Sequence, residues 1–164
     1  MHWHADYEIW ACGKEVELEH SHGLSNKVGD PTMHTHDDKK IHIEGVISKK
    51  EDASLGTFFH SVGGEISQLK LSVPAEDGMK NFKTGDSCPD GQKAELQVFV
   101  YIVQGKDYHQ QKIIDPASYI MSPYSQVPPG DCIIVEFDTP KLKTDKLCLS
   151  YKVAKQTGKL GEER

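Results

Sequence analysis

The sequence has no long apolar run and almost no arginine. Its longest apolar stretch, residues 98–103, is far shorter than the roughly 20 residues that a membrane-spanning helix requires. Arg164 is the single arginine, and the 164 residues carry a formal charge of −6. Such a chain is poorly suited to the phosphates of a nucleic acid or an anionic membrane. We therefore expect neither nucleic-acid binding nor membrane insertion of this segment.

Common catalytic and binding motifs are also missing. The chain contains no Gly-x-Ser-x-Gly, no phosphate-binding P-loop and no His-Glu-x-x-His. Its four cysteines form no Cys-x-x-Cys pair, which leaves a zinc ribbon or a thioredoxin-type redox site without support. Serine hydrolases, nucleotide-binding proteins and zincin proteases are thus not indicated.

Alternation of apolar and polar residues predicts a β-rich fold. Strands are predicted at residues 3–11, 15–19, 40–47, 66–73, 94–104, 131–138 and 146–153, with loops at 20–38 and 74–93. One short helix is predicted at about 54–63, because Ser54 is a candidate N-cap and Gly63 follows the last apolar residue of a helical repeat. We expect an α+β, β-rich domain of antiparallel hairpins or, alternatively, a β-sandwich with a helical insert. It would span residues 1–154 as one globular domain, followed by a flexible tail at 155–164.

Cysteine positions predict a disulfide framework. A hairpin centred on Pro140 places Cys132 opposite Cys148, at the Cβ spacing of about 4.5–5.5 Å found between directly opposed residues. Cys12 and Cys88 then pair by elimination. Disulfides indicate an oxidising compartment. The alternative is four reduced, buried thiols in a cytosolic protein.

Histidine is the residue whose distribution is most uneven. Seven of the nine histidines precede residue 43. They form three His-x-His pairs and one His-x-Glu: His2 with His4, His20 with His22, His34 with His36, and His42 with Glu44. Residues two apart on a strand point to one side, and two adjacent strands lie about 4.8 Å apart, so such pairs can surround one ion.

A transition-metal site is the hypothesis that follows. The predicted ligands are His2, His4, His34, His36, His42 and Glu44, with Asp37 and Asp6 as carboxylates that orient the ligand imidazoles. Neutral imidazoles with a carboxylate suit copper or zinc first, and nickel or iron as well. No Cys or Met cluster accompanies the histidines, which argues against Cu(I) and blue copper. His60 and His109 are interpreted as solvated side chains.

The His-x-His pair that follows Gly29 is similar to the start of a cupin motif. A cupin glutamate should follow within a few residues, but Lys40 and Ile41 occupy those positions. Residues 128–130 (Pro-Pro-Gly) match part of the second cupin motif, but the histidine of that motif does not follow Gly130. The sequence therefore does not favour a cupin.

Several motifs nevertheless resemble one family in order and spacing. They are His2-Trp3-His4-Ala5, Cys12-Gly13, His34-Thr35-His36-Asp37, Ile41-His42-Ile43-Glu44, Leu55-Gly56-x-Phe58-Phe59, Gly85-x-x-Cys88, Asp115-Pro116-x-x-Tyr119 and Gly130-Asp131-x-Ile133-Ile134-x-x-Phe137. Together they span roughly residues 2–138. The chain resembles small, histidine-rich bacterial and archaeal proteins that are usually anchored outside the cytoplasmic membrane, a family with no assigned activity.

The resemblance implies a location and a site. It implies that Cys12 pairs with Cys88, while Cys132 and Cys148 are additions to the family pattern. That family often has Gly near position 39 and sometimes His in place of Glu44. We expect the chain to be a trimmed extracytoplasmic domain of an anchored precursor, with Met1 placed before it.

Three functions are expected in decreasing order. The first is an extracytoplasmic protein that binds copper or zinc for sequestration, delivery or sensing. The second is a metalloenzyme, a hydrolase or an oxygenase, with an open His/carboxylate site. The third is a structural envelope domain whose histidines are solvated.

Overall fold

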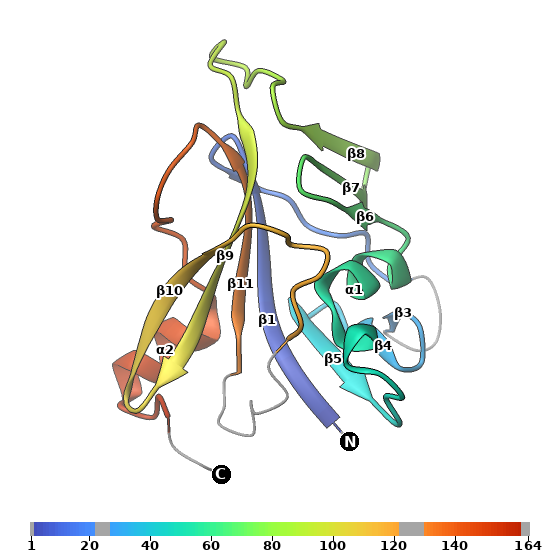
Figure 1. Ribbon diagram of the computed structural model, residues 1–164, viewed down its shortest axis with the longest axis vertical. Coiled ribbons are helices and arrows are strands. Elements are labelled where there is room, and N and C mark those ends of the chain that lie inside the picture. Colours follow the sequence, from blue (N-terminus) through green and yellow to red (C-terminus); the bar gives the residue numbers. More distant parts are fainter. Residues whose placement is uncertain (1, 22–26, 122–129, 162–164) are drawn as a thin grey trace.

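The computed structural model describes residues 2–21, 27–121 and 130–161 (Figure 1). The strands are β1 (His2–Ala11), β2 (Lys14–Glu15), β3 (Val28–Gly29), β4 (Met33–Thr35), β5 (Lys40–Glu44), β6 (Glu65–Ile66), β7 (Lys70–Ala75), β8 (Gly78–Lys83), β9 (Glu95–Gln104), β10 (Asp107–Ile113) and β11 (Cys132–Asp138). The helices are the 3₁₀ helix η1 (Lys50–Ala53), α1 (Leu55–Ser61) and α2 (Leu149–Thr157). The fold is α+β and β-rich, as predicted.

Two sheets build the domain. The large sheet has the order β10-β9-β11-β1-β5-β4-β3, with β2 paired to the end of β1, and the small sheet has the order β6-β7-β8. β1 pairs with β5 in antiparallel fashion but with β11 in parallel. The parallel pair departs from the expected antiparallel hairpins, because β1 and β11 come from opposite ends of the chain and no turn joins them.

The main core lies on one face of the large sheet. Odd-numbered residues of β1 are buried there, among them Ala5, Tyr7 and Ile9. Side chains of α1 and of the small sheet complete this core, namely Phe58, Phe59, Leu71 and Val73. Burial of each large apolar side chain stabilises the fold by about 1.5–3 kcal/mol. If β1 paired with β5 one residue out of register, its odd-numbered apolar side chains would point to the other face of the sheet. The core therefore fixes the register of β1 against β5.

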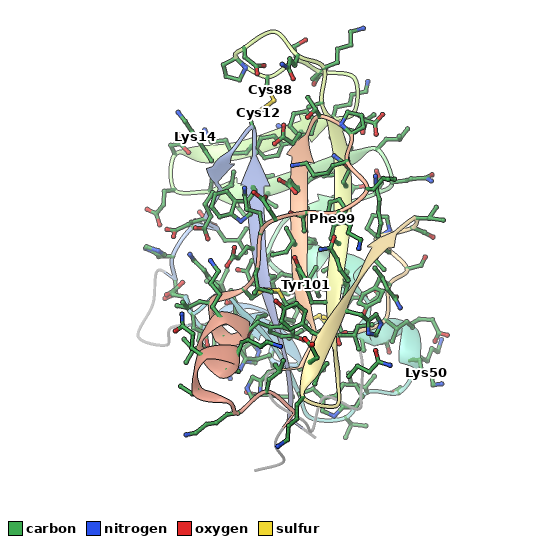
Figure 2. All side chains as sticks on the ribbon, turned by 90° about the vertical axis from the view of Figure 1, so that its left-hand side faces the viewer. Cys12, Lys14, Lys50, Cys88, Phe99 and Tyr101 are labelled. Carbon is green, nitrogen blue, oxygen red and sulfur yellow. A yellow bond between two sulfur atoms is a disulfide. The ribbon has the colours of Figure 1, made fainter. Side chains whose placement is uncertain are left out.

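Helix α2 covers part of the opposite face, as Figure 2 shows beside the labelled Tyr101. A second apolar cluster forms there, with Tyr101, Cys132 and Tyr151 among its buried members. The Tyr151 hydroxyl donates a hydrogen bond to the Tyr101 carbonyl oxygen at 3.0 Å. A disulfide between Cys132 and Cys148 ties β11 to the start of α2. The helix is therefore fixed to the sheet at its N-cap residue and along its buried side.

The predicted strand at 146–153 is wrong, because helix α2 occupies most of it. Cys132 and Cys148 are bonded as expected, but the hairpin that led to this expectation does not exist. Cys148, Tyr151 and Ala154 recur with helical spacing and pack in the second cluster, and Gly158 ends the helix with a left-handed conformation. The expected domain boundary at residue 154 falls inside this helix, and Leu160 beyond it is buried.

Other differences concern polar strands. β8 lies in the segment predicted as a loop at 74–93, and β3 and β4 lie in the one predicted at 20–38. β8 is mostly exposed and paired on one side, so its sequence shows no apolar alternation. The predicted helix is confirmed as α1, with the Ser54 hydroxyl accepting a hydrogen bond from the Thr57 N–H. Among the described helices, none combines the length and apolarity needed to cross a membrane.

The second disulfide joins Cys12 and Cys88, as predicted. Cys12 directly follows β1, and Cys88 lies in the segment between β8 and β9. Figure 2 shows both residues together at one end of the sheet. The bond thus fixes the far end of β1, away from its histidine-bearing first residues.

Candidate metal centre

A row of three histidines crosses neighbouring strands of the large sheet. His4 of β1 is directly opposite His42 of β5, and His42 is directly opposite His34 of β4. Directly paired residues point to the same side of a sheet, so the three imidazoles share one face. Ile41 and Ile43 fill the main core on the other face and fix this orientation. Figure 1 shows β5 and β4 beside the N-terminal half of β1.

The imidazole rings are in mutual contact. The centroid of the His36 ring lies 4.7 Å from that of His34 and 4.5 Å from that of His42, roughly perpendicular to both. The His34 and His42 rings are nearly parallel at 5.7 Å, and His4 meets His42 edge to face at 4.6 Å. Histidines from β1, β4, β5 and the residue after β4 therefore form one cluster.

His34 is the most buried member, with no exposed surface. Its Nδ1 lies 2.9 Å from the carbonyl oxygen of Asp30, which only accepts hydrogen bonds, so Nδ1 carries a proton. In the neutral ring Nε2 then holds the lone pair. No hydrogen bond from the described residues reaches this nitrogen, and the Glu44 Oε1 lies 3.5 Å away. With that ring neutral, a buried nitrogen lone pair faces a carboxylate oxygen.

Three donor atoms converge at this point. One each from His34, His36 and Glu44 lie within 4.8 Å of one another. Two donors about 2.1 Å from a tetrahedral ion lie about 3.4 Å apart, close to the observed separation of His34 Nε2 and Glu44 Oε1. A charge-assisted N–H···O bond would be shorter, at about 2.7–2.9 Å. The geometry therefore has the spacing of two ligands of one cation.

The turn between β4 and β5 is organised by Asp38. Its Oδ1 accepts hydrogen bonds from the His36 and Lys40 N–H groups at 3.3 and 3.2 Å and from the Thr35 hydroxyl at 3.3 Å. Its Oδ2 lies 2.9 Å from His42 Nε2. Asp38 therefore fixes the turn that carries His36 and also contacts the ring of His42.

Burial and charge shape the titration of this pair. Burial lowers the pKa of His42 below its ordinary value, although the hydrogen bond to Asp38 and its charge act in the opposite direction. Burial by itself would raise the pKa of Asp38, but the hydrogen bond from His42 and the backbone N–H groups outweigh it, so that pKa is lowered. At neutral pH the His42 ring is thus neutral and the Asp38 carboxylate charged. A neutral imidazole is the form that binds a metal ion.

Several of the predicted ligands meet in the cluster. The structure brings together His4, His34, His36, His42 and Glu44. The backbone of His2 pairs with that of Glu44, but the His2 side chain lies outside the described residues. His20 lies elsewhere, 3.0 Å from the Glu76 carboxylate at an exposed position, and His22 lies outside the described residues.

The two aspartates predicted to orient the ligands have Ser21 and Lys40 as partners. Asp37 accepts a hydrogen bond from the Ser21 hydroxyl at 3.1 Å. Asp6 is buried beside Lys40, whose Nζ lies 3.4 Å from Oδ1, and burial raises the pKa of Asp6 to about 6. The carboxylate that contacts a ring nitrogen of His42 is instead that of Asp38, which the sequence interpretation missed.

His60 and His109, interpreted as solvated, stand away from the cluster. His60 is exposed on α1, and His109 lies on β10, where its Nε2 is 3.2 Å from the Gln111 side-chain nitrogen. Neither is among the residues whose rings meet at β4 and β5. Asp30, which supplies the carbonyl to His34, was also missed, since a backbone acceptor leaves no signal in residue type.

Comparison of the chain with protein-family models, with curated proteins and with solved structures finds no match. The functional argument therefore depends on the geometry of this cluster, and the family resemblance stays a prediction.

Proposed function

We propose that this protein binds a divalent transition-metal ion, copper or zinc first, through His34, His36 and Glu44. The observation that carries the proposal is the buried Nε2 of His34, whose lone pair faces the Glu44 carboxylate at 3.5 Å. A buried nitrogen lone pair that faces a carboxylate oxygen is unfavourable, and a cation between the two atoms removes the repulsion.

The donor types support a transition metal over calcium or magnesium. Imidazole nitrogen suits copper, zinc, nickel and iron, whereas calcium and magnesium prefer oxygen ligands. Two of the three donors are imidazoles, the His42 imidazole contacts His36 of this group, and the His4 imidazole contacts His42. The described donors are nitrogen and oxygen atoms, and no cysteine of the chain is free, which favours Cu²⁺ or Zn²⁺ over Cu⁺.

The position of the cluster favours an exchangeable ion. The Glu44 side chain is 32% exposed and His36 is half-buried, so solvent reaches one side of the donor group. An ion held there can be taken up and released, as sequestration, delivery or sensing requires. Because disulfides persist mainly in oxidising compartments, we place this function outside the cytoplasm. The family resemblance gives the same location.

Calorimetric titration with Cu²⁺ and Zn²⁺ at about pH 7.5 and about pH 5.5 tests this proposal, since these values lie either side of the ordinary histidine pKa. We expect binding at the higher pH and weaker binding at the lower, because protons compete for the imidazole lone pairs. His42, whose pKa is lowered, stays neutral to lower pH than an ordinary histidine. Absence of binding heat at both values would contradict the proposal.

A metalloenzyme is the second candidate, and the number of donors favours it. Three protein donors leave at least one position on a zinc ion open to water or substrate, as in catalytic zinc sites. However, a cavity that the described residues form between β1 and the segment at 15–20 is lined by Tyr7, Leu18 and several glutamates, and by none of the three donors. We therefore rank binding above catalysis.

A further inference from the structure

We propose that Asp38 is a positioning residue that makes His42 the fourth ligand and selects Nδ1 as its donor atom. This inference rests on the proposed metal binding. His42 is not one of the three residues whose donor atoms lie within 4.8 Å, but its ring centre is only 4.5 Å from that of His36. Which of its two nitrogens can bind an ion is decided by the hydrogen bond that the other makes.

The contact between Asp38 and His42 settles the tautomer. A charged carboxylate only accepts hydrogen bonds, and its Oδ2 lies 2.9 Å from His42 Nε2. Nε2 therefore carries the proton, and the lone pair of the neutral ring is on Nδ1. His34 shows the opposite arrangement, because the Asp30 carbonyl takes the proton of Nδ1 and leaves the lone pair on Nε2. The two histidines thus present different nitrogens from adjacent strands.

The two carboxylate oxygens of Asp38 have separate roles: Oδ2 contacts His42, whereas Oδ1 holds the turn. A substitution can therefore change the contact with His42 and keep the turn. Oδ1 accepts from three donors, the His36 N–H, the Lys40 N–H and the Thr35 hydroxyl. In an Asp38→Asn variant these donors hold the amide oxygen in the same place. The amide NH₂ must then face His42 Nε2 and donate to it. The proton of His42 moves to Nδ1, so the turn is kept while the donor nitrogen is blocked.

Asp37→Asn is the matched control. It removes the same charge one residue away in the same turn, but the Asp37 carboxylate contacts Ser21 rather than a histidine. Asp37 has a φ of +60°, a backbone conformation that asparagine tolerates well. The control variant is therefore expected to fold like the natural chain and to differ from Asp38→Asn only in the contact with His42.

The experiment measures the His42 tautomer by long-range ¹H–¹⁵N NMR of the metal-free protein, and Zn²⁺ affinity by competition with a chromophoric chelator. We expect the Nε2–H tautomer in the natural chain and in Asp37→Asn, and Nδ1–H in Asp38→Asn. Zn²⁺ affinity should fall about 10- to 100-fold in Asp38→Asn, as is usual on loss of a partner of a ligand histidine, and stay unchanged in Asp37→Asn. In a His42→Ala background, Asp38→Asn should cause no further loss.

Other results overturn the inference. They are an Nδ1–H tautomer in the natural chain, unchanged affinity in Asp38→Asn, or an equal loss in both asparagine variants, which would mean a general charge effect. If the natural chain binds no Zn²⁺, the proposed function fails instead. The NMR spectra still decide whether Asp38 sets the tautomer of His42.

Discussion

Replacing Glu44 by glutamine is expected to abolish tight metal binding while leaving the metal-free protein at least as stable. The carboxylate is one of three donors, so we expect a loss of affinity beyond the roughly 100-fold that removal of an outer partner causes. In the metal-free protein, the glutamine NH₂ can donate to the buried His34 Nε2, which no described residue satisfies. This new hydrogen bond would stabilise the fold by up to about 1 kcal/mol.

Calorimetry with Zn²⁺ and urea unfolding without metal measure the two effects. Glu65→Gln is the control, because Glu65 is an exposed glutamate on β6 and loses the same charge. It should change neither quantity. Clear destabilisation of the metal-free Glu44→Gln variant would show that His34 is protonated and forms an ion pair with Glu44. A proton would then already occupy the position that we assign to the metal.

Removing the Cys12–Cys88 disulfide is expected to cost the most stability. The two residues are 76 apart in sequence, and closing a loop of that length restricts the unfolded chain by about 4–5 kcal/mol. Domains of this size are stable by only about 5–15 kcal/mol, so the double Cys→Ala variant should lose about a third of its stability or more. Urea unfolding without reductant provides the measurement.

The Cys132–Cys148 bond supplies the comparison. It closes a separation of 16 residues, for which the same argument gives about 3 kcal/mol. A larger loss from this pair than from Cys12–Cys88 would contradict the chain-entropy explanation. Cys12 directly follows β1, whose last residue, Ala11, is seven residues or about 23 Å along the strand from His4, so a Cys12/Cys88 variant that still folds should retain metal affinity.

The candidate site could be predicted from sequence largely because its residues share strand faces. His34, His42 and Glu44 have spacings that place side chains on one side of a strand, and β4 and β5 are neighbours along the chain. Strand spacing could not predict whether Asp37 or Asp38 contacts His42. The contact depends on the backbone of a turn in which Asp37 and Lys39 both have positive φ, so the carboxylates of adjacent residues point to different partners.

The fold was predictable where apolar residues repeat and unpredictable where pairing is remote. β1, β9 and α1 show clear periodicity and occur at the expected residues. The parallel pairing of β1 with β11 leaves no local signal, since it joins residues more than 120 positions apart. For α2, the alternation of apolar and polar residues between 146 and 153 predicted a strand. The helical spacing of Cys148, Tyr151 and Ala154 was therefore overlooked.

A crystal structure of the protein loaded with Zn²⁺, with anomalous data at the zinc edge, tests the central claim most directly. We predict one strong anomalous peak about 2.0–2.2 Å from His34 Nε2, a Glu44 oxygen and a His36 nitrogen. A peak only at His20, His60 or His109, or no peak at full Zn²⁺ loading, would contradict the account.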